Sequence, residues 1–152
     1  MQLLEQCSTL NEISNPAGIG FDILNDEATS VIGLEGGVVR VTDAGSPLFG
    51  TYLRVPPGAL DTPVRISIMS GDHTCSFGLS PSIKLLPNGL HFKRAVTLKV
   101  CLNDSYIIAP NELKSTEPAL YNYDETNAQW THDEAVRLDW EGNAVLCDLF
   151  HL

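Results

Sequence analysis

Four cations alternate with apolar residues in the middle of the chain: Arg54, Arg65, Lys84 and Lys99. Because successive side chains of a strand point to opposite faces, this alternation predicts a core face and an outer face that carries the cations. Residues 40–99 hold seven of the nine basic residues, although the whole chain has a formal net charge of −10. We therefore predict that these four residues form a basic surface for an acidic protein partner. The alternative is that they pair with acids of the flanking segments and only solubilise the surface.

The residue types used in catalysis and metal binding form no recognised arrangement. The four histidines are scattered, without the spacing of metal ligands: His73, His91, His132 and His151. The four cysteines lie far apart, without a Cys-x-x-Cys pair, and their disulfide state stays open: Cys7, Cys75, Cys101 and Cys147. We therefore expect no metal site, no cofactor and no activity on an external substrate. The overall acidity also argues against a nucleic acid partner, because phosphate groups are bound by clustered cations.

The elements that position the cations follow one arrangement twice: a strand, a proline-glycine turn and a second strand. The first copy is 51–60 followed by 63–68, and the second is 81–89 followed by 92–100. In each copy an alternating strand runs into a proline, which cannot donate a hydrogen bond to a sheet, and then a glycine turns the chain. Together with further short strands, this pattern predicts an all-β fold, specifically an antiparallel β-sandwich.

The ends of the chain are less regular. Residues 1–10 have the apolar spacing of one or two helical turns, 19–24 are expected to form a short strand, and 25–30 a loop. Further strands are expected after residue 118, and a short helix near 110–113. We divide the chain into an N-terminal extension, residues 1–35, and a β-sandwich domain, residues 36–152.

The sequence contains no apolar run near the roughly 20 residues of a membrane-spanning helix. Its first residues also lack the basic and apolar regions of a secretory signal. If Met1 is the natural start, we expect the protein in the cytoplasm. If Met1 was added to a longer chain, an extracellular location stays open.

The central and C-terminal segments resemble a ZU5 domain, a module found in ankyrins, netrin receptors, tight-junction scaffolds and death-domain adaptors. The resemblance rests on five pieces of sequence and covers about residues 36–152: Gly36-Gly37, the segment 53–60, Leu79-Ser80-Pro81, the segment 87–100, and Tyr121 to Trp130. It implies a β-sandwich that binds other proteins and has a regulatory or scaffolding role in signalling. It also implies, as partner, a following fragment or UPA-like domain of the same polypeptide.

The resemblance further suggests self-cleavage, because some ZU5 domains are cut at His-Phe/Ser and unrelated adhesion receptors at His-Leu/Ser or His-Leu/Thr. In this chain the corresponding residues are Phe150-His151-Leu152. His151 would be the base that activates a following hydroxyl, and Leu152 would carry the attacked carbonyl. The alternatives are a chain boundary without processing, an outward-facing His151 on an edge strand, and a secreted or cell-surface β-sandwich with an adhesive or structural role.

Overall fold

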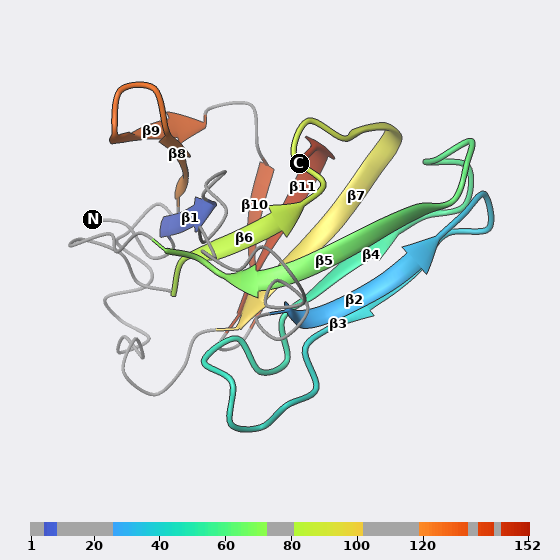
Figure 1. Cartoon of the computed structure of the whole chain (residues 1–152), viewed down its shortest axis with the longest axis horizontal. Coiled ribbons are helices and arrows are strands. Elements are labelled where there is room, and N and C mark those ends of the chain that lie inside the picture. The colour runs from blue at the N-terminus through green and yellow to red at the C-terminus, as the bar shows by residue number, and fades with distance from the viewer. Residues whose placement is uncertain (1–4, 9–25, 73–80, 102–118, 134–136, 142–143) are drawn as a thin grey trace, which may run out of the picture.

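The computed structural model describes residues 5–8, 26–72, 81–101, 119–133, 137–141 and 144–152, and this part of the chain contains strands and turns without a helix (Figure 1). The strands are β1 (Glu5–Ser8), β2 (Asp26–Ile32), β3 (Gly37–Arg40), β4 (Tyr52–Val55), β5 (Val64–Ser70), β6 (Ile83–Leu86), β7 (His91–Cys101), β8 (Ala119–Asp124), β9 (Gln129–Asp133), β10 (Arg137–Glu141) and β11 (Ala144–His151). The predicted all-β class is therefore confirmed.

The strands form two sheets. The six-stranded sheet has the order β2-β5-β6-β1-β8-β9, and the five-stranded sheet has the order β10-β11-β7-β4-β3. Strand β1 pairs in parallel with β6 and with β8, and the other strand pairs are antiparallel. The six-stranded sheet is therefore mixed, whereas the five-stranded sheet is antiparallel throughout.

One hydrophobic core lies against both sheets. Fully buried members come from each of them: Ile66, Ile68 and Ile83 from the six-stranded sheet, and Leu53, Leu98 and Val145 from the five-stranded sheet. Strand β7 shows the sequence logic, because Val96, Leu98 and Val100 are buried while the residues between them are partly exposed. Removing each such side chain from water contributes about 1.5–3 kcal/mol before entropy is counted.

The two proline-glycine corners carry the chain from one sheet to the other. The first leads from β4 to β5 through Gly58, and the second leads from β6 to β7 through Gly89. Both glycines have a φ of 78°, a conformation that side chains with a Cβ rarely adopt. The Leu86-Pro87 peptide bond at the second corner is cis. The turns inferred from the sequence are therefore present, and their effect is to connect the sheets.

A third connection between the sheets joins β2 to β3 at Gly36. This residue has a φ of 74°, and a Cβ built on it would collide with the backbone of Val55 and Pro56. Glycine is needed here for both its conformation and its size. The domain boundary expected between residues 35 and 36 falls within this turn.

The N-terminal expectations were partly wrong. Glu5–Ser8 is a strand rather than a helical turn, because its backbone pairs with β6 and β8 over long sequence distances and this pairing outweighs a short helical pattern. Most of the expected loop 25–30 belongs to β2, which is held by polar cross-strand contacts such as that between the Thr29 and Ser67 hydroxyl oxygens at 2.8 Å. The expected strand 19–24 and helix 110–113 lie outside the described residues.

Candidate binding surface

The four cations expected on one basic surface lie on two different sheets. Arg54 on β4 and Lys99 on β7 belong to the five-stranded sheet, whereas Arg65 on β5 and Lys84 on β6 belong to the six-stranded sheet. Alternation correctly places Arg54 and Lys99 away from the core. It could not show that the two pairs would be separated, because the proline-glycine corners move the chain between sheets.

Lys84 is the clearest departure from the expected surface, because its exposed fraction is 0%. Its neighbours Ile83 and Leu85 are buried in the core, and its partner in the sheet register, Met69, is only 2% exposed. Strand β6 is thus buried on both faces around this position. The long apolar stem of Lys84 packs like a hydrophobic side chain, and its ammonium group is buried with the stem. Lys84 cannot contribute to an exposed basic surface.

Arg65 is exposed but lies on a different sheet from Arg54 and Lys99. Its Nε donates a hydrogen bond of 3.4 Å to the Thr29 hydroxyl on the neighbouring strand β2. The side chain opposite it in the register is Val31, which is 67% exposed. Arg65 therefore lies on an outer face of mixed character, on the sheet that does not carry Arg54 and Lys99.

The structure instead gathers three cations around one aromatic ring on the outer face of the five-stranded sheet. The guanidinium carbon of Arg40 lies 4.7 Å from the centroid of the Tyr52 ring, and that of Arg54 lies 5.2 Å from it. The Lys99 Nζ lies 5.8 Å from the same centroid. We call these four residues the Tyr52 cluster.

The register of three strands produces this cluster. Tyr52 on β4 is directly opposite Arg40 on β3 and directly opposite Lys99 on β7. Arg54 follows Tyr52 by two residues and so lies on the same face. Direct cross-strand neighbours have Cβ atoms about 4.5–5.5 Å apart, which lets both long cationic side chains reach the ring between them.

The cations cover Tyr52, which is only 8% exposed, while Arg40 and Arg54 are themselves exposed. Attraction to the ring is worth about 0.5–1 kcal/mol for each exposed cation. Within the described residues, neither Arg40 nor Arg54 forms an ion pair with a carboxylate. The aromatic ring therefore collects positive charge on the outer face of the five-stranded sheet.

The positive charge also acts on Cys101, which lies two residues beyond Lys99 on β7. Partial burial raises the pKa of the Cys101 thiol, and the nearby charges of Lys99 and Arg40 oppose this rise. On the opposite face of the same sheet, burial raises the pKa of the Cys147 thiol to about 12, and the neighbouring Asp148 carboxylate adds to the rise. Neither of these two thiols takes part in a disulfide bond.

Sequence reasoning missed Arg40 and Tyr52. A signal was present, because Arg40 alternates with the buried Val39 and Val41, and Tyr52 alternates with the buried Leu53. Such alternation is typical of side chains on an outer face. It gave no information on the register that brings Arg40 and Lys99 to opposite sides of the ring.

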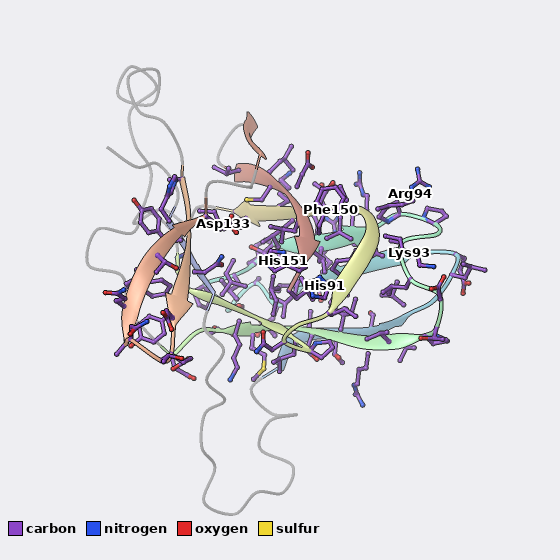
Figure 2. The ribbon with its side chains drawn as sticks, turned by 90° about the horizontal axis from the view of Figure 1, so that it is seen from above. His91, Lys93, Arg94, Asp133, Phe150 and His151 are labelled. Atoms are coloured by element: carbon purple, nitrogen blue, oxygen red, sulfur yellow. The ribbon has the colours of Figure 1, made fainter. Side chains whose placement is uncertain are left out.

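The C-terminal residues expected to take part in self-cleavage lie at the end of β11, beside the start of β7. His151 is directly opposite His91, and the centroids of their rings are 6.0 Å apart (Figure 2). The Leu152 N–H donates a 2.9 Å hydrogen bond to the Leu90 carbonyl oxygen, and the Leu152 carbonyl oxygen accepts one of 2.7 Å from the Gly89 N–H. His151 is exposed, whereas the Leu152 side chain packs against the core.

Lys93 and Arg94, near the start of β7, contact residues other than the two histidines and Leu152. Lys93 forms an ion pair with Asp61, and Arg94 donates a 2.8 Å hydrogen bond from Nη1 to the Pro57 carbonyl oxygen (Figure 2). Both contacts tie the start of β7 to the first proline-glycine corner and the residues after it. The two histidines and the Leu152 backbone therefore form a separate local arrangement.

A third surface is the hairpin of β8 and β9, at the other end of the six-stranded sheet. Two cross-strand aromatic pairs lie on one of its faces: Tyr121 with His132 at 5.3 Å, and Tyr123 with Trp130 at 5.0 Å. The turn between the strands is fixed by Asp124, which accepts hydrogen bonds from the Thr126 and Asn127 backbones and from the Asn127 side chain. The pattern of tyrosines, an acidic turn and a tryptophan in the segment from Tyr121 to Trp130 is therefore explained by contacts within this hairpin.

Comparison of the chain with models of known protein families gave no match, and comparison with curated proteins gave none either. In the described part of the chain there is no helix long and apolar enough to cross a membrane. The described residues also contain no group of three or more histidines, cysteines and acids arranged for a metal ion.

Proposed function

We propose that this chain is a ZU5-type interaction and regulatory domain that uses the outer face of its five-stranded sheet to bind an acidic segment of a protein. The Tyr52 cluster carries the proposal. Cations that are directly opposite or diagonal in a sheet repel one another unless something compensates for their charge. Tyr52 compensates in part, and an acidic partner would complete the compensation.

The charge distribution of the whole chain supports a local basic site. With a formal net charge of −10, the molecule repels a strongly acidic partner over most of its surface. Attraction would therefore depend on local groups of cations such as the cluster, which would orient the partner as well as hold it. The resemblance to ZU5 domains adds a following domain of the same polypeptide as a candidate source of the acidic segment.

Charge reversal tests this proposal. The Arg40→Glu and Arg54→Glu double variant should weaken binding of a fluorescein-labelled glutamate-rich peptide by roughly tenfold or more, because close charge pairs at interfaces contribute energies of this order. Binding by the unchanged protein should also weaken between 50 mM and 200 mM salt, as screening predicts.

Arg65→Glu is the matched control, because it reverses an exposed arginine on the other sheet. It should leave the affinity of the peptide nearly unchanged. If Arg65→Glu weakens binding as much as the cluster variant does, the effect is one of net charge and the proposed surface is wrong. Thermal unfolding of each variant shows whether the fold is kept.

A second candidate function, self-cleavage after Leu152, is favoured by the backbone contact at that residue. We propose it for a chain in which Ser or Thr follows Leu152. The Gly89 N–H would polarise the Leu152 carbonyl, as donors of an oxyanion hole do. His151 would accept the proton of the attacking hydroxyl, the peptide C–N bond would break, and the released nitrogen would take up a proton. Water would then hydrolyse the resulting ester.

Intact mass of the parent protein with the residues that follow Leu152 tests this second candidate. His151→Ala should abolish the two fragments, whereas His132→Ala, on the distant β8–β9 hairpin, should leave them unchanged. Continued cleavage of the His151→Ala protein would exclude His151 as the base. A single full-length mass for the unaltered protein would exclude cleavage under those conditions.

A further inference from the structure

The arrangement of the Tyr52 cluster indicates the chemistry of the group that it binds. We infer that the cluster recognises a phosphoryl group on a protein segment, in preference to a carboxylate side chain. This inference rests on the proposed function, because it names the anion that the same surface would bind. It is carried by the type, number and separation of the cations.

The two arginines lie close enough together to act on one ligand segment. Both guanidinium carbons lie near the same ring centroid, at 4.7 and 5.2 Å, so the sum of these distances keeps them less than about 10 Å apart. Each guanidinium group can donate charge-assisted hydrogen bonds of about 2.7–2.9 Å, so one ligand segment that lies over the ring can accept hydrogen bonds from both side chains. A phosphoryl group offers three acceptor oxygens pointing in different directions, whereas a carboxylate offers two in one plane.

The amount of charge also favours a phosphoryl group. Phosphoserine carries about −1.5 to −2 charges at neutral pH, against −1 for an aspartate or a glutamate. Two exposed arginines with no carboxylate partner among the described residues would be better neutralised by the larger charge. Among the described acids, Asp148 on β11 is aligned with Arg54 on β4. The two residues are separated by Thr97 on β7, which is opposite both of them in the register.

The residue types point in the same direction. The guanidinium group presents several N–H donors in a fixed planar fork, which matches phosphate geometry, while a lysine acts as a point charge. Packing on Tyr52 restricts the positions of both forks before a ligand arrives, so less side-chain freedom is lost on binding. A protein segment is favoured over a phosphorylated membrane surface, because the chain's net charge of −10 would oppose approach to an extended anionic surface.

Three labelled peptides of identical acidic context, with Ser, phosphoserine or Glu at the centre, provide the test. Titration of the folded protein should give roughly tenfold or greater tightening for phosphoserine over Ser, and a clear preference over Glu. In the Arg40→Lys and Arg54→Lys double variant the charge stays but the forks are lost. This variant should keep its affinity for the Glu peptide and lose most of the preference for phosphoserine.

The matched control is Arg65→Lys, which makes the same change on the other sheet and should retain the preference. Equal affinity for all three peptides would overturn the inference and leave the proposed acidic partner intact. Absence of binding to every peptide would overturn both. Binding to vesicles that contain a phosphoinositide, without binding to the phosphoserine peptide, would assign the phosphate to a lipid headgroup and also overturn the inference. A preference that survives in the double lysine variant would show that the arginine forks are not its source.

Discussion

The outer faces of the two sheets carry the same alternating pattern of sequence, but the lysines on them differ in exposure. On the five-stranded sheet, Arg54 is exposed and Lys99 is partly exposed, and both contact the ring of Tyr52. On the six-stranded sheet, Lys84 has an exposed fraction of 0% and its register partner Met69 one of 2%. The pattern thus predicts the side on which a residue lies, but it does not predict whether that side meets water.

The two faces also differ in how their cations come together. Arg40 and Lys99 are 59 positions apart in the sequence and lie on opposite sides of Tyr52 because β4 pairs with both β3 and β7. Arg65 on the other sheet instead has Val31 opposite it and a hydroxyl contact with Thr29. A binding surface therefore depends on the strand register more than on the number of basic residues.

The largest expected effect is a difference in the free energy of unfolding between variants of Lys84 and of Lys99. Lys84→Ala is expected to reduce the free energy of unfolding by about 2–5 kcal/mol, because it removes a fully buried stem and leaves a cavity. Lys99→Ala should cost less than about 1 kcal/mol, because Lys99 is partly exposed and its ring contact is weak. Urea unfolding of both variants measures the difference.

Lys84→Met separates packing from charge at this position, since it keeps most of the apolar stem. Recovery of most of the stability in Lys84→Met would show that the stem carries the effect, and a loss as large as in Lys84→Ala would assign it to the ammonium group. Equal costs for Lys84→Ala and Lys99→Ala would contradict the difference between the two faces.

The next effect concerns the two thiols of the five-stranded sheet, in a Cys7→Ser and Cys75→Ser background. Iodoacetamide at pH 8 should modify the half-buried Cys101 slowly and Cys147 only through unfolding, because the thiolate is the reactive form and burial disfavours it. Peptide mass analysis over time measures both rates. Faster modification of Cys147 than of Cys101 would contradict the assignment of Cys147 to the core.

The raised pKa of the Cys147 thiol predicts a loss of stability at alkaline pH. The pKa of Cys147 rises from 9.0 to about 12 on folding, so the folded state holds the proton more tightly. This contribution to stability is fully present below pH 9 and is lost as the pH rises toward about 12. A Cys147→Ala variant should lose less stability over this range, measured by urea unfolding at each pH. An unchanged pH dependence would contradict the raised pKa.

A smaller effect is expected at the ring that gathers the cations. Tyr52→Leu should lower stability by roughly 1–2 kcal/mol through loss of the cation contacts and of ring packing, whereas Tyr52→Phe should retain both. Thermal unfolding of the two variants measures this. If Leu and Phe are equally tolerated, the ring does not hold the arginines in place.

The smallest effect should occur at the β8–β9 turn of the six-stranded sheet. The hydrogen bond from the Asn127 side chain lowers the pKa of Asp124 below its ordinary value of 3.8, and the backbone N–H groups of Thr126 and Asn127 add to this. The stabilising contribution is present above pH 3.8 and is lost as the pH falls through the lowered value. NMR titration should show the pKa of Asp124 rising in Asn127→Ala, and an unchanged pKa would exclude the Asn127 side chain as the main cause.

Little of the candidate binding surface could be predicted residue by residue. Alternation identified Arg54 and Lys99 as outward-facing, and the structure brings them together with Arg40 and Tyr52. It also assigned Lys84 to the surface, which was wrong, because the face of a strand can be covered by other parts of the chain. The parallel strand β1 escaped prediction for a related reason, since four residues contain too little local pattern to reveal distant partners.

By itself, the sequence determined the all-β class, the positions of the proline-glycine corners and the core face of strands such as β7. These features follow from local chemistry, because prolines, glycines and alternating side chains constrain the backbone wherever they occur. Tertiary structure alone decided which strands are neighbours, in which register they pair, and which outer faces meet water. Those outcomes depend on contacts between residues far apart in the chain, and the Tyr52 cluster exists only where three such strands lie side by side.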